Sequence, residues 1–187
     1  MMRNKYERTI YAPRGVVFET FREKQTDMNR KLPNIVDSRV VEVCEDGDCR
    51  RRMVIWVAGN APIPVVLRPL INPKQIEWRV FQLWDARNWT CDFQTEATHF
   101  KDNVDVKGRW TFDERIPGRT DVVIESTISI DARGIPGLPP QLATPVGALV
   151  ERIMQKLTAP NIEKVFKVAE AMVKSEMKDR KKGSNQK

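Results

Sequence analysis

The longest helical pattern of the chain, from Thr144 to about Met177, is the sequence feature that most restricts the fold. Apolar residues recur along it at spacings of three and four, which is typical of a helix with one buried face. Thr144 is a good N-cap residue and Pro145 suits the first helical position, so we expect the helix to begin there. Pro160 lies inside the pattern and removes one backbone hydrogen bond, which predicts a kink or a short break near residues 158–160.

The apolar stripe of this helix allows two interpretations. The simpler one is a plain core helix that covers a sheet. The other is a two-part helix that is gripped by a curved sheet and lines a ligand cavity.

Patterns of period two fill most of the chain before the helix and predict strands. A first strand is expected at Tyr6–Tyr11, followed by two short helices near residues 16–24 and 27–32. Six further strands are expected at residues 34–45, 48–58, 75–85, 88–99, 103–114 and 120–131. The last three alternate apolar and polar residues and are joined by short turns. This predicts an antiparallel meander with one covered face and one face in water.

A hairpin turn is expected at Asp46-Gly47, a dipeptide typical of two-residue hairpin loops. With these two residues as the turn, Cys44 would lie opposite Cys49, close enough for a disulfide. The next rung would pair Glu42 with Arg51. The cysteine count is three and no secretory signal precedes the first strand, so we expect free thiols in a cytoplasmic protein.

Residues that carry chemistry are few. The chain has one histidine, His99, so a Ser/His/Asp or Cys/His arrangement would have to use it. Only Cys91 and His99 could complete a zinc site with the paired cysteines, and their spacing is not that of metal ligands. No nucleophile elbow, metalloprotease motif, P-loop or dinucleotide glycine pattern is present. We therefore expect no metal and no cofactor, and we assign no catalytic residue. An enzyme is the less favoured class of protein, and the one form of catalysis left open is general acid–base catalysis by a single residue in the pocket.

The segment Gly59–Pro73 combines four prolines with many apolar residues. Proline excludes a central strand, and the apolar content exceeds that of an ordinary solvated loop. One interpretation is an edge strand and turn packed on the core. The other is a lid over a cavity mouth or a loop that touches a membrane, with four apolar residues as the lid. These are Ile63, Val65, Leu67 and Leu70.

Length and charge favour a single domain, residues 1–177, followed by a basic and unstructured tail, residues 178–187. The chain has 187 residues, 41% of them apolar and 30% charged, and a net charge of +7. No apolar run approaches the roughly 18 residues that a membrane-spanning helix needs. The residues from Lys174 onward include six basic and two acidic side chains. Such a terminus is usually a solvated tail, and the functional alternative is transient contact with an anionic membrane. We expect no nucleic acid partner, because the body lacks a basic face with interleaved aromatics.

The order of these elements resembles the START-like superfamily, also named SRPBCC, which includes the birch pollen allergen. The opening Ile10-Tyr11-Ala12-Pro13-Arg14-Gly15-Val16-Val17-Phe18 is similar to that superfamily's usual first strand, Ala-Pro turn and first helix. A weaker similarity links the apolar loop and the overall length to PRELI-like phospholipid-transfer proteins. The resemblance implies an α+β helix-grip fold, in which a curved seven-stranded antiparallel sheet wraps around the C-terminal helix and leaves a hydrophobic cavity. It also implies a function, since members bind or carry lipids, sterols and polyketides, and some are cyclases or dehydratases.

From the fold and the apolar faces we expect the chain to bind, and to transfer, a hydrophobic ligand, with a lipid as the first choice. The alternatives are a cyclase or dehydratase acting on a hydrophobic substrate in the same cavity, and a partner-binding domain with a filled cavity. The polar candidates in the cavity are Thr95, His99, Ser126 and also Gln82. The expected ligand-binding residues are Trp78, Val80, Phe93, Thr95, His99, Val106, Trp110, Ile124, Ser126, Ile128, Leu149, Ile153 and Leu157.

Overall fold

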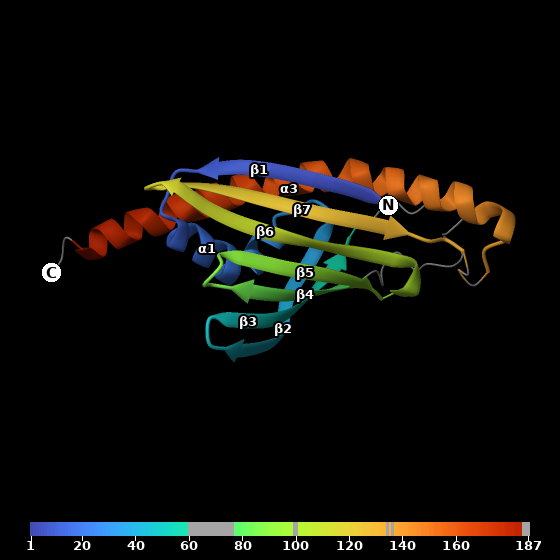
Figure 1. The fold of residues 1–187 in the computed structure, drawn as a ribbon, viewed down its shortest axis with the longest axis horizontal. Coiled ribbons are helices and arrows are strands. Elements are labelled where there is room, and N and C mark those ends of the chain that lie inside the picture. The colour runs from blue at the N-terminus through green and yellow to red at the C-terminus, as the bar shows by residue number, and fades with distance from the viewer. Residues whose placement is uncertain (60–76, 99–100, 134, 136, 185–187) are drawn as a thin grey trace.

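The structure is a computed structural model, and it describes residues 1–59, 77–98, 101–133, 135 and 137–184. One antiparallel sheet carries all helices on one side (Figure 1). The strands are β1 (Met2–Ile10), β2 (Ile35–Asp46), β3 (Cys49–Ala58), β4 (Glu77–Asp85), β5 (Thr90–Ala97), β6 (Val104–Ile116) and β7 (Arg119–Ile130). The helices are α1 (Arg14–Glu23), α2 (Gln25–Asn29) and α3 (Pro140–Ser184), with a short 3-10 turn η3 (Lys101–Asn103). The strand order β1-β7-β6-β5-β4-β3-β2 and the long C-terminal helix confirm the predicted fold class.

The clean alternation of β5, β6 and β7 places apolar side chains toward the helices. Cys91, Trp110 and Ile124 lie opposite one another in register and are all buried. The next rung faces solvent and contains Asp92 and Arg109, and Arg109 Nη2 donates to Asp92 Oδ2 at 2.9 Å. One face of these strands is therefore covered and the other is in water, as the sequence predicts.

An aromatic cluster fixes α1 against the sheet. The ring of Phe18 makes edge-to-face contacts with Trp84, Trp89 and Phe112, with centroids 5.4, 5.3 and 5.2 Å apart. This geometry adds favourable quadrupole interactions to the burial of apolar surface. Trp89 has a positive φ of 56°, which is uncommon for a bulky residue, and the guanidinium of Arg14 lies 4.5 Å from its ring.

The second half of α3 joins the same cluster. Phe166, Ala169 and Val173 are almost completely buried, and the Phe166 ring meets Trp110 with centroids 6.0 Å apart. Their spacings of three and four place them on one side of the helix, which explains the apolar stripe of the sequence.

The bounds of α3 correct three expectations. The helix begins at Pro140 rather than at Thr144, so a different proline takes the first helical position. It is continuous through Pro145 and Pro160, so the short break expected near residues 158–160 is wrong. Packing of both halves onto the sheet outweighs the lost backbone hydrogen bond. The helix also continues to Ser184, so residues 178–184 are helical where an unstructured tail was expected.

The turn of the β2–β3 hairpin lies one residue later than expected. Asp46 pairs with Cys49, which leaves Gly47 and Asp48 as the two loop residues. Gly47 has a φ of 56°, and a glycine at the first central position of a two-residue loop is the requirement of a type II′ turn.

The expected cross-strand pairs of the hairpin are wrong in consequence. Cys44 lies opposite Arg51 rather than Cys49, and Glu42 lies opposite Met53, after an irregularity in β2. The three cysteines are free thiols in the structure. None of the helices in the described part of the chain combines the length and apolar character needed to cross a membrane.

The aromatic packing of α3 makes a prediction for stability. Replacing Phe166 by alanine should lower the free energy of unfolding by about 3–5 kcal/mol, because it leaves a cavity beside Trp110. Leu149→Ala is the matched control, because Leu149 is 41% exposed on the same helix and should change stability by less than about 1 kcal/mol. Urea unfolding measures both variants. Equal losses would contradict the assignment of Phe166 to the core.

Two glycines with open space around them should respond to alanine with opposite signs. Gly47→Ala should destabilise the protein by about 1 kcal/mol, because an L-residue is strained at φ 56°. Gly15→Ala should stabilise it by about 0.5 kcal/mol, because Gly15 lies in α1 and alanine favours helix. Thermal unfolding of both variants gives the signs, and stabilisation by Gly47→Ala would rule out the left-handed turn.

Candidate functional site

Two separate hydrophobic clusters close the space between α3 and the sheet. The larger cluster joins α1, α2 and the second half of α3 to the sheet. The smaller joins the segment after β7 to the first turns of α3, through Ala132, Ile135, Ala143 and Val146. The helix residues between these clusters, among them Ile153, Met154 and Thr158, are only half-buried and belong to neither. The middle of α3 is therefore the part of the helix that belongs to neither described cluster.

One row of helix-facing residues crosses the sheet in this middle region. The pairing of neighbouring strands places one residue of each strand in line, and we name this set the central row. It consists of Asn4 (β1), Ser126 (β7), Gly108 (β6), Phe93 (β5), Gln82 (β4) and Arg52 (β3). Four of its six members have polar side chains, whereas the flanking rows of the same face are mostly apolar.

Gly108 leaves room on this face for the ring of Phe93. A Cβ atom at position 108 would lie 2.6 Å from Phe93 Cζ and 2.3 Å from the backbone oxygen of Glu125. A side chain there would displace the ring or the neighbouring strand. The glycine thus allows Phe93 to lie flat across the sheet surface.

Asn4 holds a polar group that no described residue satisfies. Its Nδ2 atom is buried without a hydrogen-bond partner, as is Trp56 Nε1 on β3. Two ion pairs on either side of Asn4 in the sequence connect β1 and the residue before it to α3. They join the Met1 amino terminus to Glu151 and Arg8 to Glu163. Buried donors are normally paired, so each of these groups needs an explanation such as a ligand or an ordered water.

Arg52 places a buried positive charge at the other end of the central row. Its side chain is 6% exposed and donates to the backbone carbonyl of Arg22 at the end of α1. Burial lowers the pKa of its guanidinium, with Glu23 acting in the opposite direction. Within the described residues Arg52 has no carboxylate at ion-pair distance, since Glu23 pairs with Arg22 and Arg50. Such a group can bind an anionic or strongly polar oxygen.

Gln82 and Cys91 complete the polar character of this region. Gln82 Oε1 accepts a hydrogen bond from Trp84 Nε1 at 3.2 Å, which fixes the amide and leaves its NH₂ group for another acceptor. Burial raises the pKa of the Cys91 thiol, with Asp92 contributing, so it stays protonated and unreactive. Among the described residues, no three His, Cys, Asp or Glu side chains gather to hold a metal ion.

The predicted site residues differ in burial, and some of them are not described. Val80, Ile128, Trp110 and Ile124 are buried, and the last two belong to the larger hydrophobic cluster. Trp78, Phe93, Thr95, Val106, Ser126 and Ile153 are half-buried, and Leu149 is exposed. Leu157 lies in α3, and nothing is described of its side chain. His99 and the lid residues Ile63, Val65, Leu67 and Leu70 lie outside the described residues. The assignment of these residues to ligand binding stays a prediction.

Sequence reasoning missed Asn4 and Arg52. We expected β1 to begin at Tyr6, and extending its alternation back to Met2 would have placed Asn4 on the covered face. Arg52 follows two other arginines in a hairpin whose strands carry apolar residues on both faces. Its burial depends on α1, which no local pattern reveals.

An open groove with a volume of about 1170 Å³ lies on the opposite, solvent-facing side of the sheet. Met53, Phe81 and Leu83 line one part of it. Exposed ion pairs of Lys5 with Glu125 and of Arg109 with Asp92 line the rest. The solvent-facing residues that line the groove form two rows across the sheet, and the central row lies between these two rows. The groove and the helix-facing side chains of the central row therefore lie on opposite sides of the same part of the sheet. None of the described residues that border this groove lies in α3, so the groove is distinct from the cavity expected between helix and sheet.

Comparison with known proteins supports the fold. No protein-family model matches the sequence, and the search of curated proteins found no match. The solved structure of TTHA0849 from Thermus thermophilus is 22% identical, with 93% of this chain and 98% of that chain covered and a TM-score of 0.63. The Zhui aromatase/cyclase from Streptomyces sp. R1128 is 16% identical, with coverages of 92% and 95% and a TM-score of 0.66. Ara h 8.0201 is 17% identical, with coverages of 93% and 98% and a TM-score of 0.51. The chain therefore has the helix-grip fold that the order of its elements predicted.

Proposed function

We propose that the chain binds a hydrophobic ligand, with a lipid as the first choice, between the central row and the middle of α3. The observation that carries this proposal is the buried Nδ2 atom of Asn4, which has no hydrogen-bond partner among the described residues and lies outside both hydrophobic clusters. Protein interiors are normally close-packed and their polar groups paired. A ligand with a polar oxygen would supply the missing partner.

The chemistry of the surrounding side chains indicates an elongated, mostly apolar molecule. Val80, Val106 and Ile128 supply apolar surface beside the central row. Asn4 and Arg52 stand on strands five positions apart in the sheet, about 24 Å along its surface at about 4.8 Å per strand. Pockets of this composition, apolar with a few placed polar groups, are typical of small-molecule sites.

The segment Gly59–Pro73 stays our proposed lid, because its apolar composition suits a cover for such a site. Transfer of a lipid would also require contact with a membrane.

A cyclase or dehydratase acting in the same cavity is the second candidate. It is favoured by the similarity to the Zhui aromatase/cyclase structure, which is a similarity of fold. Of the described helix-facing residues in the middle of the sheet, none is a carboxylate, so Arg52 and His99 are the groups to consider for catalysis. Mass spectrometry of ligand recovered from the protein separates the candidates. A ligand unchanged after incubation supports binding, and one lighter by a water supports the enzyme.

Blocking the central row should remove ligand binding. Ser126→Trp projects a large ring toward α3, and we expect it to weaken binding of the apolar dye Nile red by about tenfold or more. Fluorescence titration of the purified protein measures the effect. Native mass spectrometry should show any co-purified ligand reduced in the same variant.

Thr127→Trp is the matched control, because Thr127 is the next residue of β7 and faces solvent on the other side of the sheet. It should leave Nile red binding unchanged. Circular dichroism establishes that both variants fold. Undiminished binding in folded Ser126→Trp, or equal loss in both variants, would exclude the site proposed here.

A further inference from the structure

All seven lysines of α3 lie on one side of the helix. They are Lys156, Lys164, Lys167, Lys174, Lys178, Lys181 and Lys182, and all are exposed. At about 100° per residue they fall within an arc of roughly 100°, about a third of the helix circumference. At about 1.5 Å per residue the set extends over roughly 40 Å. We name this set the lysine stripe.

The four glutamates of the same helix are neutralised by the body of the protein. Each one forms an ion pair with a cation outside the helix, and Glu163 does so while exposed on the same side of the helix as the lysines. The pairs are the Met1 amino terminus with Glu151, Arg8 with Glu163 and Glu170, and Lys24 with Glu176. Glu176 raises the pKa of Lys24, and the charge of Asp179, the remaining acid of the helix, adds to this. No lysine of the stripe forms an ion pair with another residue in the described part of the chain. The helix therefore presents a positive ridge to solvent.

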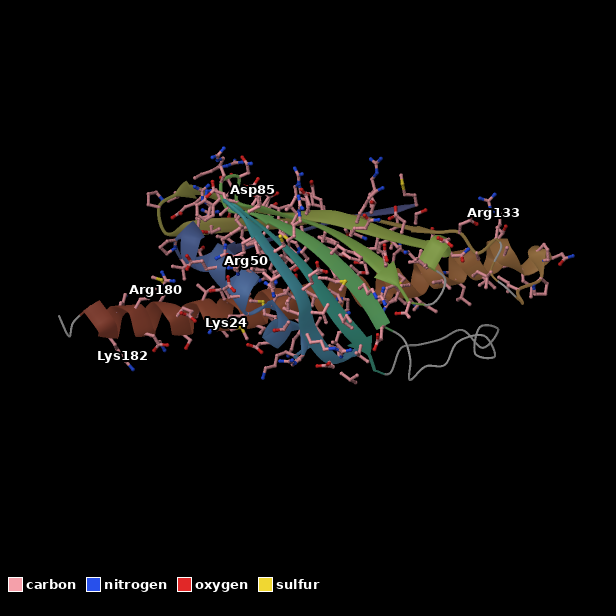
Figure 2. All side chains as sticks on the ribbon, turned by 90° about the horizontal axis from the view of Figure 1, so that it is seen from below. Lys24, Arg50, Asp85, Arg133, Arg180 and Lys182 are labelled. Carbon is pink, nitrogen blue, oxygen red and sulfur yellow. The ribbon has the colours of Figure 1, made fainter. Side chains whose placement is uncertain are left out.

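Contacts at the end of α3 fix the rotation of this ridge. Val173 is buried, and Met177 packs against the larger cluster. Arg180 Nη2 lies 2.8 Å from Glu19 Oε2 on α1. In Figure 2 Arg180 lies on the side of α1, while Lys182 points away from the body. The stripe thus belongs to a docked helix rather than to a loose terminal tail.

We propose that the lysine stripe docks the protein on an anionic phospholipid surface. The lysines follow one side of a single helix over roughly 40 Å, so a flat surface can approach several of them at once. Its charges are all lysines, which act as hydrated point charges rather than as forks for specific phosphate contacts. Its helix carries one aromatic residue, Phe166, which is buried, so it offers no stacking platform for nucleic acid bases. Attraction of this kind acts between a polybasic segment and the diffuse field of anionic lipids.

The inference goes beyond the proposed function, since it does not depend on which ligand occupies the interior. The same helix carries the stripe on one side and borders the central row on the other. Docking would therefore bring the wall of the proposed ligand site against the lipid surface.

Vesicle binding of a triple variant tests the proposal. The variant carries Lys167→Gln, Lys174→Gln and Lys178→Gln, and is compared with wild type by vesicle co-sedimentation at low salt. The vesicles contain phosphatidylcholine and phosphatidylserine in equal parts, with pure phosphatidylcholine as reference. We expect about fivefold weaker partitioning for each lysine removed, and so a loss of about a hundredfold. Binding of wild type should also fall as salt is raised.

The control variant removes three lysines that lie outside α3 and already have carboxylate partners. It carries Lys5→Gln, Lys101→Gln and Lys107→Gln, whose lysines pair with Glu125, Glu96 and Asp105. Both triple variants have the same net charge, so only the position of the charge differs. The control should bind anionic vesicles within about twofold of wild type, since a paired exposed lysine contributes little field.

Four outcomes would overturn the proposal. Wild type could fail to bind anionic vesicles, or bind neutral vesicles equally well. The two triple variants could lose binding equally, which would show an effect of net charge alone. Tighter binding of a single-stranded DNA oligonucleotide, lost in the stripe variant, would assign the ridge to nucleic acid. Nile red binding by the stripe variant reports on the interior independently, so failure of docking and failure of the proposed ligand site give different results.

Discussion

The attachment of α3 at two separate places, to the sheet and to the segment after β7, is the constraint on which the rest of the structure depends. At one end Phe166 packs on Trp110 and joins the rings around Phe18, and at the other end Val146 packs in the cluster after β7. A single helix of 45 residues bridges these two clusters. Asn4 and Ser126 lie on the helix-facing side of the sheet, and neither belongs to either cluster.

Charge along the seam between β1 and α3 reinforces this attachment. Arg8 contacts Glu163 and Glu170 on α3, and its guanidinium lies 5.8 Å from the centre of the Phe166 ring. Because these groups are partly exposed, each contact alone contributes little to stability. Their larger effect is on the rotation of α3 about its own axis, because opposite charges on β1 and α3 fix which side of the helix faces β1.

The sequence predicts the layers of this fold well and its exact registers less well. Alternation in β5, β6 and β7 predicts the covered face, because a one-residue slip would expose every apolar side chain. The β2–β3 hairpin escapes this control, because residues 39–46 of β2 are exposed on both faces and the position of Gly47 alone decides the pairing. The start of α3 was misplaced because two prolines suit a first helical turn, and only packing of Ala143 and Val146 shows that the helix has already begun. Arg52 could not be recognised, because its burial comes from α1, about 30 residues earlier in the chain.

The distribution of charge on α3 depends on both the sequence of the helix and its packing against the body. A helix with four glutamates and seven lysines would carry a mixed and weak field if both kinds of side chain faced solvent. The sheet and the short helices instead supply Arg8, Lys24 and the amino terminus as partners for the glutamates. The fold thus pairs the glutamate charges with cations of the body and leaves the unpaired lysines dominant on the outer side. The basic character of the outer surface of α3 is therefore a property of the folded protein, which the composition of the helix alone does not predict.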